Sequence, residues 1–223
     1  MAKKPMPSLG LRATLGLMFL LAVIGGILFG AGGWAWQGWI YLAVFGGASA
    51  LITIDLARRD PALLERRVQA GPLAEPTLAQ KLIQAVAGLA FLAIFVVSAR
   101  TRIECVAMTV TGDAMVALGF WIVARVFRAN TFTSATVGVE AEQRVIDTGP
   151  YAIVRHPMYS GALVLLIGTP LALGSWWGLT VIPVMIGILV ARLLDEERLL
   201  RRDLPGYVSY CERVRWRLVP GVF

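Results

Sequence analysis

Two polar stretches in the C-terminal part of the sequence carry side chains that could bind a charged small molecule. The first, residues 130–161, holds the single histidine of the chain, His156. The second, residues 192–210, holds Arg192 and Glu196, whose spacing of four residues places both on one face of a helix. Imidazole, guanidinium and carboxylate groups, together with the tyrosines of both stretches, offer hydrogen bonds and charge to a polar ligand.

Each of these side chains also has a purely structural interpretation. Arg192 and Glu196 would form an ion pair within their helix, because opposite charges at this spacing attract. His156 precedes Pro157, which restricts it to an extended or turn conformation, and a histidine in such a loop is often structural. The tyrosines would serve as interfacial residues of a membrane protein. Taken singly, none of these residues indicates a function.

One uncharged apolar run, residues 161–191, separates the two polar stretches. Its 31 residues exceed the roughly 20 that one membrane crossing needs. A break around Pro170 and Gly174, followed by a pair of tryptophans, predicts a turn inside the run. We therefore expect a helical hairpin, which returns the chain to the membrane face that it left and brings His156 close to Glu196.

The remainder of the chain is apolar enough to cross a membrane several times. Of its 223 residues, 57% are hydrophobic and 16% are charged, whereas soluble domains have about 45–50% and about 25%. Four further runs with few or no charges have the length of a membrane-spanning helix. They are residues 13–34, 35–54, 82–99 and 106–126.

These runs predict an all-α fold, a polytopic membrane helix bundle of about six spans whose last two form the hairpin, with a pocket at the cytoplasmic face. We expect a single domain over residues 1–223, with four spans in residues 1–127 and the functional region in residues 128–223. Gly26 and Gly30, four residues apart in the first run, are suited to close helix packing. A cleaved signal peptide is the alternative for that run, which is too long and lacks a clear cleavage site.

The positions of the basic residues predict the orientation of the chain. Lysines and arginines precede the first run, fill the loops after the second and fourth runs and fill the C-terminal tail, whereas the opposite loops hold Arg100 and Arg102. Because Lys and Arg favour the cytoplasmic side, we expect an integral, multi-pass membrane protein with both termini in the cytoplasm. The net charge of +7 then matches anionic lipid headgroups rather than nucleic acid. With two cysteines and one histidine, a Cys/His zinc cluster cannot be built, so no metal is expected.

The polar residues form an ordered series of short motifs around the predicted hairpin. In chain order the series is Gly149-Pro150-Tyr151, Arg155-His156-Pro157-Met158-Tyr159, the hairpin, Arg192-x-x-x-Glu196-Glu197 and Leu204-Pro205-Gly206-Tyr207. This series resembles the isoprenylcysteine carboxyl methyltransferase family, and phospholipid methyltransferases share a related pattern. The resemblance covers about residues 130–220.

The resemblance implies an integral membrane enzyme that transfers a methyl group from S-adenosyl-L-methionine to a lipophilic acceptor at the cytoplasmic membrane face. Arg192 stands where the family has an arginine that contacts the acceptor. We expect His156 or Glu197 to remove a proton if the acceptor is an amine or a thiol. By the same resemblance, the cofactor-binding residues are Gln143, Arg144, Val145, Ile146, Tyr151, His156, Pro157, Met158, Tyr159 and Glu196.

These residue types suit methyl transfer, because an in-line displacement depends mainly on the positioning of donor and acceptor. Glu196 can accept hydrogen bonds, tyrosine faces can lie against a sulfonium, and Arg192 can hold an acceptor carboxylate in a bidentate fork. A phospholipid N-methyltransferase and a small-thiol S-methyltransferase are alternatives on the same scaffold. A non-catalytic membrane scaffold or small-solute carrier is a further alternative. The predicted spans hold few of the ionisable residues that mark a transport pathway through a membrane.

Overall fold

The computed structural model describes residues 8–68, 74–75, 77–133 and 143–223, and within them every regular element is a helix. This confirms the predicted all-α fold. The α-helices are α1 (Leu9–Gly32), α2 (Trp36–Arg59), α3 (Pro61–Val68), α4 (Leu78–Arg100), α5 (Val106–Ala129), α6 (Pro157–Ala172), α7 (Ile182–Asp203) and α8 (Tyr207–Arg213). Two short 3-10 helices are η2 (Gly149–Ala152) and η3 (Trp177–Val181).

Five of the described helices are long and apolar enough to cross a membrane, namely α1, α2, α4, α5 and the continuous segment Trp177–Asp203. The sixth predicted crossing is α6, a shorter apolar helix of 16 residues. At 1.5 Å per residue α6 is about 24 Å long, less than the hydrocarbon core of about 30 Å. The count of about six spans therefore corresponds to five full-length helices and one short arm of the hairpin.

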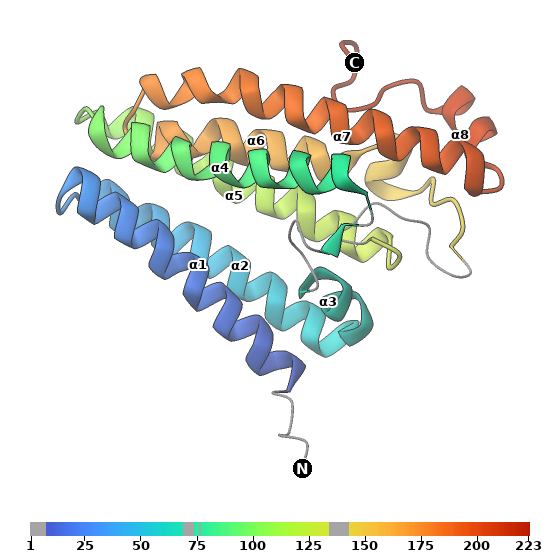
Figure 1. Cartoon of the computed structure of the whole chain (residues 1–223), viewed down its shortest axis with the longest axis horizontal. Helices are drawn as coiled ribbons and strands as arrows, with labels where there is room; N and C mark the ends of the chain where they lie inside the picture. Colours follow the sequence, from blue (N-terminus) through green and yellow to red (C-terminus); the bar gives the residue numbers. More distant parts are fainter. Residues whose placement is uncertain (1–7, 69–73, 76, 134–142) are drawn as a thin grey trace.

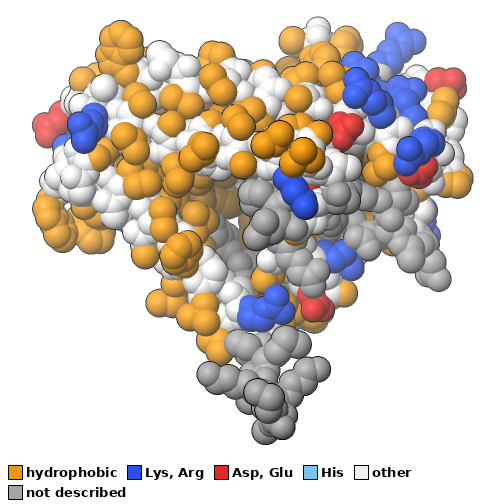
Figure 2. Space-filling model, viewed as in Figure 1, with side chains coloured by type: hydrophobic (Ala, Val, Ile, Leu, Met, Phe, Trp, Pro, Cys, Tyr) orange, Lys and Arg blue, Asp and Glu red, His pale blue; other side chains and the backbone are white. Residues whose placement is uncertain are grey.

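The long helices lie side by side, with α4, α5, α6 and α7 in one layered group and the pair α1 and α2 beside it (Figure 1). Helix α3 and helix α8 lie toward the same end of the molecule (Figure 1). Figure 2 shows hydrophobic side chains spread along the long helices and many of the charged ones gathered at the end that carries α8. This distribution is that of a bundle whose sides face lipid and whose polar end faces water.

The predicted hairpin between the two polar stretches is present. Helix α6 ends just after Pro170, and Gly174 turns the chain with a φ of 73°. A Cβ on Gly174 would lie 2.5 Å from the Ile103 carbonyl oxygen, so the turn packs closely on the connection between α4 and α5. Trp176 and Trp177 follow with 60% and 65% of their surfaces exposed, as expected of interfacial anchors.

Helices α5 and α6 pack against each other at backbone distance. A Cβ on Gly119 of α5 would lie 2.7 Å from the Gly161 carbonyl oxygen, and one on Gly168 of α6 would lie 2.7 Å from Met115 Cβ. A Cβ on Gly112 would overlap the backbone of Ala172. This close packing fixes α6, whose first residues follow His156, against the centre of the bundle.

Candidate active site

A cavity of about 460 Å³ opens at the end of the bundle where the two polar stretches meet. Its walls come from α3, α4, α5, α6, α7, α8 and the segment around residues 143–146. Ten of the twelve predicted site residues line it, namely Gln143, Arg144, Val145, Ile146, Tyr151, His156, Met158, Tyr159, Arg192 and Glu196. Pro157 and Glu197 are not among the lining residues. The predicted site is thus one cavity, although the roles of its residues stay predictions.

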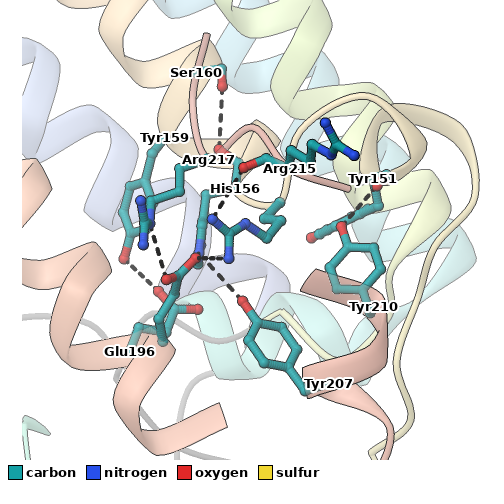
Figure 3. Close-up of polar contacts among 11 residues, drawn as sticks. Tyr151, His156, Tyr159, Ser160, Glu196, Tyr207, Tyr210, Arg215 and Arg217 are labelled. Carbon is teal, nitrogen blue, oxygen red and sulfur yellow. Dashed lines mark hydrogen bonds and ion pairs between the residues drawn. The ribbon is translucent and has the colours of Figure 1, made fainter. Parts of the chain in front are cut away.

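The hairpin brings the start of α6 against the middle of α7, as the sequence predicted. The Tyr159 hydroxyl donates a hydrogen bond of 2.8 Å to Glu196 Oε2. His156 Nε2 lies 3.2 Å from Glu197 Oε1, and its ring lies beside that of Tyr159 with 5.8 Å between centroids. Figure 3 shows these side chains converging from the two helices. Residues about forty positions apart in the chain are therefore direct neighbours.

Glu197 is a buried anchor for three cationic or polar partners rather than a wall of the cavity. Arg155 Nη1 lies 3.0 Å from its Oε1, and Arg217 Nε donates to its Oε2 at 3.0 Å. His156 approaches the same Oε1 atom that contacts Arg155. Both carboxylate oxygens of Glu197 are therefore engaged within the protein, and its role as the group that removes a proton from an acceptor stays a prediction. The arrangement favours Glu197 as the group that orients His156.

The C-terminal tail completes this cluster, and sequence reasoning gave it no such role. Backbone N–H groups of Arg155 and His156 donate to the carbonyl oxygens of Trp216 and Arg217, each at 2.9 Å. The Ser160 hydroxyl donates to the Leu218 carbonyl oxygen at 2.6 Å (Figure 3). The tail therefore clamps the loop that carries His156. The arginines of the tail are the sequence feature that could have indicated a contact with the acidic residues of α7.

The partly buried Tyr151 and the buried Tyr207 and Tyr210 of α8 form one wall of the cavity. The Tyr210 hydroxyl donates to the Tyr151 carbonyl oxygen at 2.7 Å (Figure 3). Asn130 Nδ2 donates to the Tyr151 hydroxyl at 3.0 Å. Burial raises the pKa of Tyr151 to about 12 and raises the pKa values of Tyr207 and Tyr210 well above their ordinary value. These phenols therefore stay neutral at physiological pH and act through hydrogen bonds and ring faces.

Arg192 meets a partner that the sequence did not indicate. Its Nη1 lies 2.8 Å from Glu75 Oε1 and 3.4 Å from Gln80 Oε1. The helical spacing predicted Glu196 as the partner of Arg192. In the structure, the Glu196 carboxylate accepts a hydrogen bond from the Tyr159 hydroxyl. Glu75 lies just before α4, far earlier in the chain, so local spacing could not reveal the contact.

The N-terminal half supplies wall residues that sequence reasoning missed. Arg67 of α3 and Gln84 of α4 line the polar part of the cavity. The guanidinium carbon of Arg67 lies 5.3 Å from the ring centroid of Phe127, and burial lowers the pKa of Arg67. The cavity also has apolar lining residues from α4, α5, α6 and α7, which include Phe91, Val123, Ala162, Leu165, Leu166, Met185 and Leu189.

Comparison with known proteins finds a family that matches part of the chain. The model of the phospholipid methyltransferase family matches residues 107–204, from the first turn of α5 to the end of α7. No curated protein matches the chain. The matched region contains α5, the α6–α7 hairpin and all predicted site residues. Over this region the chain is similar to phospholipid methyltransferases, the family that includes isoprenylcysteine carboxyl methyltransferase-like proteins, and the similarity supports a membrane methyltransferase.

Proposed function

We propose that this protein is an integral membrane methyltransferase that uses S-adenosyl-L-methionine and acts on a lipophilic acceptor. The observation that carries the proposal is the composition of the cavity of about 460 Å³ at the polar end of the bundle. Its lining combines the polar motif residues with apolar side chains of α4, α5, α6 and α7. A charged methyl donor and a lipophilic acceptor can therefore bind side by side in one cavity.

The residues present fit the proposed cofactor. A volume of about 460 Å³ lies within the range of about 300–1,000 Å³ typical of small-molecule sites. Glu196 has one carboxylate oxygen held by Tyr159, which leaves acceptor capacity for hydroxyl or amino groups. Tyr151, Tyr159 and Tyr207 all line the cavity and can present ring faces to a sulfonium. When bound, the cofactor would supply an electrophilic methyl group.

The chain's own contribution is positioning. Tyr159 fixes the Glu196 carboxylate, and Glu197 together with the tail fixes His156. Groups that are held in this way can keep donor and acceptor aligned at little further entropic cost. The apolar side chains of the lining would limit the access of water to the reacting atoms.

Two acceptor classes have specific support. A prenylcysteine carboxylate, as in isoprenylcysteine carboxyl O-methyltransferases, is the acceptor that an arginine suits, and Arg192 lines the cavity, although it already contacts Glu75. A phospholipid amine is supported by the family whose model matches residues 107–204. A small thiol would use the same cavity with His156 as the nearest candidate base.

The proposal is tested by incubating membranes that contain the protein with methyl-labelled cofactor. We expect label to enter the fraction that organic solvent extracts, and we expect Glu196→Gln to reduce this transfer strongly because it removes the carboxylate of the polar wall. Glu212→Gln is the matched control, since Glu212 is exposed on α8 outside the cavity lining. Label that is absent from every lipid, peptide and thiol fraction would contradict the proposal and favour a non-catalytic scaffold.

A further inference from the structure

Glu75 is a buried carboxylate that reaches into the polar end of the bundle from the connection before α4. Only 2% of its surface is exposed, and its Oε1 lies 2.8 Å from Arg192 Nη1. Gln80 reinforces the contact, because its Oε1 accepts from Arg192 and its Nε2 donates to Asp195 Oδ2. The start of α4 is thereby tied to the middle of α7.

This contact changes the charge that the cavity presents. Arg192 lines the cavity with 9% of its surface exposed, so its guanidinium is largely removed from water. A buried guanidinium that already faces a carboxylate is neutralised, and a second carboxylate brought to it would also meet the negative charge of Glu75. An anionic acceptor group therefore finds little net attraction at this position.

The contact between Glu75 and Arg192 also follows from the packing of the helices, without any ligand. Gln80 belongs to the first turn of α4, and Thr77 is the N-cap residue of this helix. The Thr77 hydroxyl accepts a hydrogen bond from the Gln80 backbone N–H at 3.2 Å. Helix α4 is itself packed against α7 and η3. The carboxylate of Glu75 is thus presented to Arg192 by the packing of the bundle.

Resting on the methyltransferase function proposed above, we propose that Glu75 is a specificity-determining residue, which neutralises Arg192 and makes the cavity select lipophilic acceptors that place no anionic group beside it. By this account, Arg192 alone would favour a carboxylate acceptor, whereas the pair of Glu75 and Arg192 favours an uncharged or cationic one. The residue that sets the preference lies outside residues 107–204, where the family match is found.

The test compares two probes of the same size and lipid tail, the anionic N-palmitoylglycine and its uncharged primary amide. Binding is measured as thermal stabilisation of the purified protein in a neutral detergent. We expect the wild-type protein to bind the amide at least about tenfold more tightly than the carboxylate, and Glu75→Gln to bind the carboxylate at least about tenfold more tightly than wild type does. Glu65→Gln, at an exposed position of α3, should keep the wild-type preference.

A wild-type preference for the carboxylate would overturn the proposal, and so would a folded Glu75→Gln protein with an unchanged preference. The wild-type comparison needs no substitution, so it decides the matter even if Glu75→Gln does not fold. Glu75→Asp, which keeps the charge, should keep the preference for the amide. Failure of the proposed function gives a different result, because methyl transfer and cofactor binding would then be absent while the probe preference could still be measured.

Discussion

At the scale of single residues, the predicted contacts are those that one hairpin determines. Tyr159 meets Glu196, and His156 meets the adjacent Glu197, because the two polar stretches begin and end the same fold-back. The contacts of Arg217 and Glu75 were not predicted. These contacts depend on where the C-terminal tail and the start of α4 pack in the bundle. The pattern of apolar and polar residues within either segment does not determine that packing.

The buried cluster around Glu197 predicts a large effect on stability. Replacing Glu197 with Gln leaves the guanidinium groups of Arg155 and Arg217 without their shared counter-charge in a buried setting. Loss of one partner of a buried ion pair costs about 3–5 kcal/mol. We expect a clearly lower midpoint of thermal unfolding in detergent, measured by intrinsic fluorescence.

The matched control for that substitution is Asp203→Asn. Asp203 pairs with Arg202 at the exposed end of α7, where solvent screens the interaction, so its loss should change the unfolding midpoint little. Equal midpoints for Glu197→Gln and wild type would show that the cluster does not hold the tail against the His156 loop.

At the scale of the helices, the lengths of the apolar runs predicted the membrane-spanning helices well. The sequence was a poorer guide to which helices pack closely against each other. The runs at residues 82–99 and 106–126 lie within observed helices, and all but the last two residues of the run 13–34 lie in α1, because a span must satisfy its backbone hydrogen bonds internally. The small-residue pair Gly26 and Gly30 was expected to mark close packing, and the structure shows open space around both. The close contact is instead made by glycines of α5 and α6.

This contrast gives a direct test of the α5–α6 contact. Gly112→Ala places a methyl group onto the backbone of Ala172, and such overpacking costs about 1–3 kcal/mol or more. Gly26→Ala meets no atom within 4 Å and replaces glycine by a better helix former. We expect Gly112→Ala to unfold at lower temperature in detergent and Gly26→Ala to unfold at an equal or higher one. The reverse order would contradict the packing described for α5 and α6.

At the scale of the whole molecule, the cavity joins parts of the chain that the sequence had separated. Residues 1–127 were expected to supply spans and residues 128–223 the functional region. The structure adds Arg67, Gln84 and Phe91 to the walls, so the N-terminal half also shapes the site. Hydropathy could reveal these residues as parts of spans and loops, whereas their direction toward the cavity follows from how the helices pack.

The predicted orientation can be tested with the two cysteines of the protein, both free and partly exposed. Cys105 precedes α5 at the end of the bundle opposite to the cavity, and Cys211 lies in α8. If both termini are cytoplasmic, a membrane-impermeant maleimide should label Cys105 in right-side-out vesicles and Cys211 in inverted ones. Cys105→Ser and Cys211→Ser identify each signal. Labelling with the opposite sidedness would place the site on the other face of the membrane.

The central claim is that the cavity binds S-adenosyl-L-methionine, and calorimetric titration of the purified protein in detergent tests it most directly. We predict saturable binding to wild type and binding to Glu196→Gln that is weaker by about 1.5–3 kcal/mol, which is about 10- to 150-fold, because a charge-assisted hydrogen bond is lost. Glu212→Gln should bind as wild type does. Absence of binding to wild type, or equal affinity for Glu196→Gln, would contradict the account.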